Sequence, residues 1–246
     1  MLSNAQSKYI RSLTQQKYRK QYNVFLAEGD KIAKEWLMST HAINMIIATQ
    51  DWAEANKALV QKHLEAELCI VTEQELEKVS VLQAAHKALL VVPVPEQDIS
   101  GIGQGWCIAV AQLQDPGNMG TIIRIADWFG ISHVVASPDS VDFYNPKVVQ
   151  AAMGGHLRVQ LVTQELEQFI SQAKLPVFAA TLGGDNIYTV DNPGKGIILI
   201  GNESKGLPEQ LANLATQKVT IPRKGGAESL NAAVSAGIIT ALLAGR

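Results

Sequence analysis

The features that mark exported and membrane-embedded proteins are absent from this chain of 246 residues. No run of about 18 apolar residues without polar breaks occurs away from the C-terminus, and the apolar tail is too short to cross a bilayer securely. The first residues, MLSNAQSKYIRSL, are polar and basic and lack the apolar core of a signal peptide. We therefore expect a cytoplasmic protein without a membrane partner.

Cysteine and histidine are scarce as well. Cys69 and Cys107 form no CxxC motif and lie in strand-like apolar runs, which favours buried, reduced thiols over a redox pair. The five histidines never stand at the spacing of metal ligands, so we expect no metal site.

Three common catalytic motifs also fail. The glycines of residues 101–105 precede a strand, whereas a dinucleotide-binding motif must follow a strand and open a helix. Residues 194–196 lack the glycine spacing and the Ser or Thr of a P-loop, and no G-x-S-x-G elbow occurs. Hydride transfer, NTP hydrolysis and serine hydrolysis lose their usual support.

What the chain does contain is an apolar pattern that restarts near residue 106. Hydrophobic residues make up 47% of the sequence, enough for sizeable cores. Residues 1–93 alternate short helix-like and strand-like segments, beginning with one helix over about 4–19, and residues 94–105 have the proline and glycine content of a linker. Residues 106–246 have longer, continuously apolar strands between helices, which predicts an α/β domain with a parallel sheet covered on both faces.

The pattern of this second domain predicts individual elements. Its last helix is apolar on every face and is therefore expected to be buried. The expected strands are 107–111, 133–136, 176–180, 197–201 and 218–221, and the expected helices are 119–129, 146–152, 164–173, 208–215 and 230–243.

Basic residues gather at the N-terminus although the net charge of the chain is −2. Residues 1–34 contain seven Lys and Arg against two acids, and three tyrosines are interleaved with them. Such a face suits RNA phosphates and base stacking, and a solvated amphipathic helix explains the charges equally well. The residues expected to contact RNA here are Lys8, Arg11, Lys17, Arg19 and Lys20.

Polar turns follow three strand-like runs of the second domain. Ligands of parallel sheets bind beyond the carboxyl ends of the strands, so converging turns would form a ligand pocket. The polar residues are Asn118 and Arg124 in the first turn, Glu203 in the second, and Ser229 and Asn231 in the third.

Each turn also has an ordinary structural explanation. Asn118 can cap the helix that follows, and Arg124 can pair with Asp127 on a solvated face. The second turn can be a simple strand-to-helix connection with a proline near the first helical position. Ser229 can cap the last helix, whereas Asn231, placed inside that helix, needs another explanation.

Together the three turns resemble the signature motifs of a known enzyme family. They are N-x-G-x3-R-x-A over 118–126, L-I-G-N-E-x-x-G-L over 199–207, and I-P-…-E-S-L-N-…-A-x-G-I over 221–238. In order, spacing and context they resemble those of the SpoU/TrmH-type RNA ribose 2′-O-methyltransferases of the SPOUT superfamily. S-K-Y-I-R-S-L-…-F-L-A-E-G, over 7–29, resembles the substrate-binding domain that often precedes this catalytic domain.

The resemblance implies a fold, a cofactor and roles for residues. It implies a small RNA-binding domain like ribosomal protein L30e, then a SPOUT domain with a C-terminal trefoil knot that binds S-adenosylmethionine and usually forms a homodimer. By position, Asn118, Arg124, Glu203, Ser229 and Asn231 are the expected catalytic residues. Those expected at the cofactor are Thr181, Leu182, Gly183, Ile200, Gly201, Asn202, Ile221, Leu230 and Ala233. Arg223, where the family commonly has methionine, and Lys224 are expected to contact RNA.

The expected function is therefore methyl transfer to a ribose 2′-hydroxyl of structured RNA, with rRNA favoured over tRNA and DNA not expected. The main alternative is a non-catalytic RNA-binding or ribosome-assembly protein that retains the fold. Methylation of a base or a protein has less support, because those uses favour other motifs.

Overall fold

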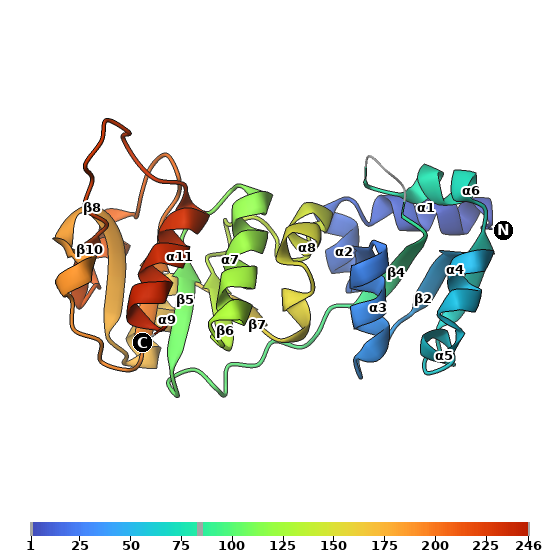
Figure 1. Cartoon of the computed structure of the whole chain (residues 1–246), viewed down its shortest axis with the longest axis horizontal. Helices are drawn as coiled ribbons and strands as arrows, with labels where there is room; N and C mark the ends of the chain where they lie inside the picture. Colours follow the sequence, from blue (N-terminus) through green and yellow to red (C-terminus); the bar gives the residue numbers. More distant parts are fainter. Residues whose placement is uncertain (1, 83–85, 246) are drawn as a thin grey trace. The chain divides into compact units, whose positions relative to one another are not determined.

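The structure, a computed structural model, describes residues 2–82 and 86–245. These residues form two compact units (Figure 1). Unit 1 contains the chain up to Glu96 together with Tyr144–Leu157. Unit 2 contains Gln97–Phe143 and the chain from Arg158 onward.

This division differs from the expected one in residues 144–157, which lie with the N-terminal unit. Helix α8 (Pro146–Ala152) packs against strand β1 (Val24–Glu28) of unit 1. Val149 is buried in the core there, and Gln150 Nε2 donates a hydrogen bond of 2.5 Å to the Glu28 carbonyl. The amphipathic pattern of α8 predicts a buried face but not which core buries it.

The segment expected as a linker, residues 94–105, also differs from expectation, because part of it packs against unit 2. His133 Nε2 lies 3.1 Å from the Asp98 carbonyl oxygen, at hydrogen-bond distance. A Cβ on Gly101 would stand 2.9 Å from Cε1 of the same ring, so a larger residue there would have to move the imidazole. His133 itself is buried, and its burial lowers the pKa of the imidazole.

Unit 1 is built on a mixed sheet of four strands in the order β1-β4-β2-β3. Strand β4 (Ala88–Pro93) runs antiparallel to β1 and to β2 (Met45–Thr49), and β2 pairs in parallel with β3 (Glu67–Val71). Alternate residues of β1 enter different cores, Phe25 on one face and Leu26 on the other. The helices of this unit are α1 (Asn4–Ser12), α2 (Gln16–Tyr22), α3 (Asp30–Met38), α4 (Gln50–Ala55), α5 (Lys57–Val60) and α6 (Glu73–Val79).

The single helix expected over 4–19 is two helices, because the chain turns between α1 and α2. Ser12 and Thr14 side chains donate to the carbonyls of Tyr9 and Arg11, which ends α1. Arg19 Nη1 donates to the Leu13 and Thr14 carbonyls at 2.9 and 2.8 Å. The Arg19 side chain is only 3% exposed, so it stabilises the turn from inside the fold.

Unit 2 contains the expected parallel sheet, with six strands in the order β10-β8-β9-β5-β6-β7 and every pair parallel. Their bounds are β5 (Trp106–Val110), β6 (His133–Ala136), β7 (Gln160–Thr163), β8 (Val177–Asn186), β9 (Gly196–Ile200) and β10 (Gln217–Thr220). The helices are α7 (Pro116–Trp128), α9 (Leu166–Ala173), α10 (Glu209–Asn213) and α11 (Ala232–Leu243). The α/β class predicted for this part of the chain is confirmed.

Three details differ from expectation. Strand β7 was not expected, because its four residues have polar ends and a buried Leu-Val centre too short to predict a strand. Strand β8 runs on to Asn186, six residues beyond its expected end, with an exposed second half beside β10. Helix α11 is buried on one side only, since Val234 is 50% exposed.

The cysteines lie as expected, since Cys69 and Cys107 are both buried and unpaired. Burial raises the pKa of the Cys107 thiol to about 12. None of the helices within 2–82 and 86–245 has the length and apolar content needed to span a membrane.

Candidate active site

The order of the strands brings the first two polar turns together. Strands β5 and β9 are neighbours, run in parallel, and pair in register from Trp106↔Gly196 to Val110↔Ile200. The chain therefore leaves both strands at the same edge of the sheet. Just beyond them, Asn202 Nδ2 donates to the Gln112 carbonyl at 2.7 Å and joins the two turns.

A chain of hydrogen bonds then links all three turns through Asn118. Asn118 Nδ2 donates to Glu203 Oε1, and Asn231 Nδ2 donates to Asn118 Oδ1, each at 2.8 Å. The sequence separates Asn118 from its partners by 85 and 113 residues. Asn118 is only 7% exposed, so its amide both donates and accepts in a largely dry position. Asn118, Glu203 and Asn231, here called the polar trio, therefore meet as the motifs predicted.

Neither asparagine has the local role that its position in the sequence first suggests. The N-cap of α7 is Asp115, whose carboxylate accepts from the Asn118 backbone N–H at 2.7 Å. Asn118 lies one turn inside the helix, which leaves its side chain available to Glu203 and Asn231. The N-cap of α11 is Asn231, because its Oδ1 accepts from the N–H groups of Ala233 and Val234. Ser229, expected as an alternative cap, lies in the exposed segment before that helix.

The loop that carries Glu203 is held by its own backbone. Asn202 and Gly206 exchange two backbone hydrogen bonds of 3.0 and 2.9 Å, and Asn202 Oδ1 accepts from the N–H groups of Ser204 and Lys205. A Cβ on Gly201 would stand 2.5 Å from the carbonyl carbon of Gly206. Position 201 needs glycine because the loop folds back onto it. The sequence pattern alone does not reveal this reason.

Gln112 joins the first two turns and was not singled out from the sequence. It follows β5 with a φ of 54°, a left-handed conformation that is uncommon for glutamine and typical of strained positions near functional sites. Its N–H donates to Ser137 Oγ at 2.8 Å, and its carbonyl accepts from Asn202. No residue type in the sequence signals this conformation.

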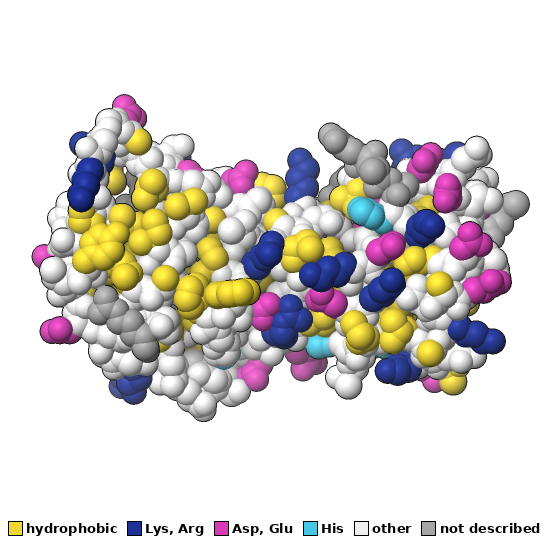
Figure 2. Space-filling view, viewed as in Figure 1, with side chains coloured by type: hydrophobic (Ala, Val, Ile, Leu, Met, Phe, Trp, Pro, Cys, Tyr) yellow, Lys and Arg dark blue, Asp and Glu magenta, His cyan; other side chains and the backbone are white. Residues whose placement is uncertain are grey.

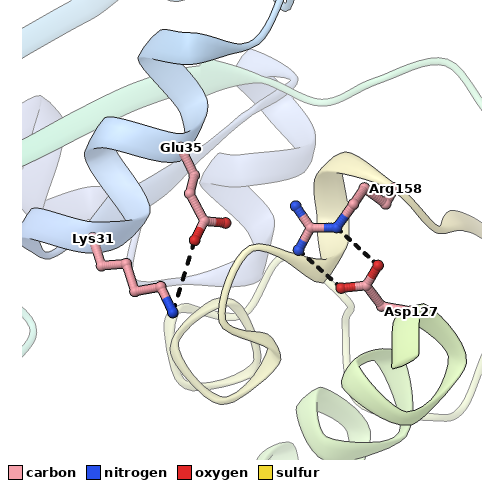
Figure 3. Close-up of polar contacts among 4 residues, drawn as sticks. All are labelled: Lys31, Glu35, Asp127 and Arg158. Carbon is pink, nitrogen blue, oxygen red and sulfur yellow. Dashed lines mark hydrogen bonds and ion pairs between the residues drawn. The ribbon is translucent and has the colours of Figure 1, made fainter.

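Arg124 is not part of the polar trio. Its side chain is exposed on α7, and within 2–82 and 86–245 its guanidinium takes part in no hydrogen bond or ion pair. The pair with Asp127 allowed by the sequence does not form, because Arg158 binds the Asp127 carboxylate with two bonds of 2.8 Å (Figure 3). Arg124 shares its exposed face of α7 with Thr121 and Trp128, at helical spacings of three and four residues.

Comparison with family models now identifies the chain. The model of the SpoU rRNA methylase family matches residues 105–241, which includes the whole polar trio. The chain belongs to this family. The model of the MRM3-like substrate-binding domain matches residues 4–89, within unit 1.

Individual relatives of this SpoU family member align along almost the whole chain. The 23S rRNA (guanosine(2553)-2′-O)-methyltransferase RlmP of Bacillus subtilis is 26% identical over 98% of this chain and 97% of its own. A solved structure from Porphyromonas gingivalis, assigned to the TrmH family of RNA methyltransferases, is 31% identical with a TM-score of 0.85, and 98% of each chain is covered. An AdoMet-bound rRNA methyltransferase from Sinorhizobium meliloti is 29% identical with a TM-score of 0.86, covering 98% of this chain and 95% of that one.

The residues expected at the cofactor have features of a partly open site. Strand β8 pairs with β9 only as far as Ala179↔Leu199, and Thr181 follows. Thr181 Oγ1 is buried and has no hydrogen-bond partner among the described residues, although buried hydroxyls are normally satisfied. Leu182 and Leu230 are 80% and 46% exposed, and Gly183 has open space where a Cβ would lie. An unsatisfied hydroxyl and exposed apolar side chains within this expected set fit a ligand that has polar and apolar parts.

The other residues of that expected set differ in burial. Ile200 and Ala233 are buried, and Ile221 is half-buried. Residues 223–230 form an exposed segment, in which Arg223 Nη1 donates to the Ala227 carbonyl at 3.2 Å and Lys224 is exposed. In the described chain, no group of three or more His, Cys, Asp or Glu could hold a metal ion.

The expected RNA contacts of unit 1 need one correction. Lys8, Arg11, Lys17 and Lys20 are exposed, as a phosphate-binding surface requires. Arg19 is buried and bonded to backbone carbonyls, so it has no surface from which to contact RNA.

Proposed function

We propose that this protein transfers a methyl group from S-adenosylmethionine to a ribose 2′-hydroxyl of ribosomal RNA. The observation that carries the proposal is the polar trio, a hydrogen-bonded chain made from all three family motifs. Family membership and the RlmP relative, named for 2′-O-methylation of 23S rRNA, support the reaction and the substrate. The AdoMet-bound relative supports the cofactor.

The bound cofactor supplies an electrophilic methyl group on a sulfonium sulfur. The protein must align the ribose hydroxyl with that methyl and assist the loss of the hydroxyl proton. The trio provides a fixed polar surface for alignment, because Asn118 is buried and its amide is bonded on both sides. Ser229, in the same third motif, is assigned to the hydroxyl, and Glu203 keeps the network anchored.

Arg124 is assigned to an RNA phosphate rather than to the proton. An arginine is a poor base because its guanidinium stays protonated at any accessible pH. It binds phosphates well because its N–H donors match phosphate oxygens in pairs. Its exposure and the absence of a partner among the described residues leave it available for this role.

The cofactor site is proposed at the carboxyl ends of β8 and β9 and at the start of α11. The backbone around Gly201 and Asn202, the Thr181–Gly183 segment, and Leu230 would surround the ligand. The C-terminal segment would form the trefoil knot characteristic of the SPOUT superfamily. Ile200, Ile221 and Ala233 complete the proposed lining.

A homodimer through α7 and α11 is part of the proposal. The two helices pack together, with the Cβ position of Gly237 only 3.4 Å from Ile125 Cδ1. Trp128 of α7 is 83% exposed and Val234 of α11 is 50% exposed, and Figure 2 shows hydrophobic side chains gathered over this part of unit 2. Large exposed apolar patches mark interaction sites, and a second copy with the same patch would cover this one. Arg124 lies on the α7 face that such a dimer would use.

RNA contacts are proposed for Lys8, Arg11, Lys17 and Lys20 in unit 1 and for Arg223 and Lys224 in unit 2. Ribosomal RNA is preferred to transfer RNA because a separate binding domain suits structured rRNA elements. A bacterial-type rRNA substrate would place the protein in the cytoplasm.

The test combines cofactor uptake with product mapping. The wild-type protein should bind S-adenosylmethionine in calorimetry and transfer its methyl to a ribose, identified by mass spectrometry of digested rRNA. Arg124→Ala should keep cofactor uptake and lose methyl transfer at least tenfold, whereas Lys62→Ala, an exposed cation of unit 1, should keep both. Absent cofactor uptake by the wild type would favour the non-catalytic RNA-binding alternative, and full activity of Arg124→Ala would remove the arginine from the reaction.

A further inference from the structure

Unit 1 has a cavity of about 540 Å³ between α1, α2 and the segment that follows α6. This volume lies within the range of about 300–1,000 Å³ typical of small-molecule sites. All the lining residues belong to unit 1, and none of them belongs to the polar trio.

The lining is cationic. Lys8 and Arg11 of α1 and Lys78 of α6 contribute to it, and none of the described residues that line the cavity is acidic. All three cations are exposed and therefore accessible from solvent. These three cations outnumber the one carboxylate bonded to the lining in the described chain, the buried Glu28 that accepts from Ser80 and Val81, so the local field favours an anion.

The rest of the lining suits a nucleoside. Tyr18 presents a half-buried aromatic side chain, and its ring is stacked with Tyr22 at 6.4 Å and 14° between planes. The ammonium of the exposed Lys17 lies 4.6 Å from the centroid of the same ring, where a stacking base would displace it. Ser12, Thr14, Gln15 and Ser80 add hydroxyl and amide groups. Aromatic side chains that stack on unpaired bases, with nearby hydrogen-bonding groups, are the usual means of recognising single-stranded RNA.

Two buried ionisable residues hold segments that line this cavity. Arg19 donates to the Leu13 and Thr14 carbonyls and so stabilises the α1–α2 turn. Glu28, 1% exposed, accepts hydrogen bonds from Ser80 Oγ and from the Val81 N–H. Burial raises the pKa of Glu28, which shows the cost of keeping a carboxylate there. A cavity whose lining is held in this way loses little entropy on binding.

We propose that this cavity binds a single unpaired nucleotide of the RNA, with the base against Tyr18 and its phosphates on Lys8, Arg11 and Lys78. The proposal rests on the proposed function in taking RNA as the substrate, and it adds a recognition site that lies wholly within unit 1. The nucleotide held there serves to select the RNA, because no residue assigned to methyl transfer lines the cavity.

The test compares two short RNA hairpins that differ by one bulged nucleotide, using fluorescence anisotropy with the full-length protein at fixed salt. The bulged hairpin should bind about 5- to 150-fold more tightly, the range that corresponds to stacking of one base. Tyr18→Leu keeps the apolar contact with the core but removes the aromatic ring, so it should abolish most of this difference. Tyr18→Phe should retain it.

The cations are tested through the salt dependence of binding. Lys78→Ala should weaken binding of the bulged hairpin and reduce the slope of log affinity against log salt by about one. Lys57→Ala removes an exposed cation on α5 that does not line the cavity, so this matched control should change neither the affinity for the bulged hairpin nor the salt slope.

Equal binding of the two hairpins by the wild type, or an unchanged preference in Tyr18→Leu, would overturn the nucleotide site. S-adenosylmethionine uptake, measured on the same wild-type sample, reports unit 2 separately. A bulge preference without cofactor uptake would refute the proposed function and leave this site standing. Cofactor uptake without a bulge preference would overturn the nucleotide site and leave the proposed function standing.

Discussion

Replacing Asn118 by alanine should affect both the stability and the activity of the enzyme, because one amide joins all three motifs. The substitution leaves the Glu203 carboxylate without its amide donor and Asn231 Nδ2 without its acceptor. A hydrogen bond to a charged group contributes about 1.5–3 kcal/mol and a neutral one about 0.5–1.5 kcal/mol. Glu203 is half-buried and Asn231 is exposed, so water can replace part of each bond. We therefore expect a loss of about 2 kcal/mol, near the lower end of the summed range.

Urea unfolding followed by circular dichroism measures this loss as a lower midpoint at unchanged slope. In a chain of this size the same loss corresponds to about 4–8 °C in Tm. Thr121→Ala, on the exposed face of the same helix, is the control and should change stability by less than about 0.5 kcal/mol. If Asn118→Ala matches the Thr121 control in midpoint and retains full methyl transfer, the polar trio does not hold the site together.

Three further predictions concern the loop after β9, the segment before β5 and the outer face of α7. Gly201→Ala should destabilise by about 1–3 kcal/mol in urea unfolding, because its Cβ would overlap the Gly206 backbone, whereas Gly183→Ala, in open space, should not. Burial lowers the pKa of His133 in the folded protein below its value of about 6.5 in the unfolded chain. As the pH falls, the unfolded chain therefore binds a proton at this histidine before the folded protein does. The urea midpoint should therefore fall as pH drops below about 6.5, and His133→Asn should show a smaller fall; identical pH profiles would contradict this assignment. If the proposed dimer forms through α7 and α11, Trp128→Glu should give a monomer in analytical ultracentrifugation where the wild type gives a dimer. An unchanged sedimentation coefficient would exclude this face as the interface.

Much of the fold could be predicted because it depends on local patterns. Continuous apolar runs predicted the parallel sheet of unit 2, and α8 has the bounds expected from the sequence. The packing of α8 in unit 1 could not be predicted, because its partner β1 is more than 100 residues away in the chain. Amphipathic spacing shows that a helix buries one face, but the identity of the burying surface depends on tertiary structure.

The candidate site shows the same limit at the level of side chains. The motifs correctly indicated that Asn118, Glu203 and Asn231 belong together, but their local roles were misjudged. Asp115 caps α7 although Asn118 is an equally good capping residue by type, and only the position of the helix start decides between them. Arg19 was expected at the surface because it lies in a basic stretch, yet the carbonyls of a helix-ending turn bind it inside the fold.

The central claim, ribose methylation of ribosomal RNA by this protein, is tested most directly by position-resolved 2′-O-methyl profiling of total RNA from cells with and without the gene. We predict that one rRNA ribose loses its methyl group in the deletion strain, regains it with the wild-type gene, and fails to regain it with Asn118→Ala. An rRNA methylation profile that is the same with and without the gene would contradict the account.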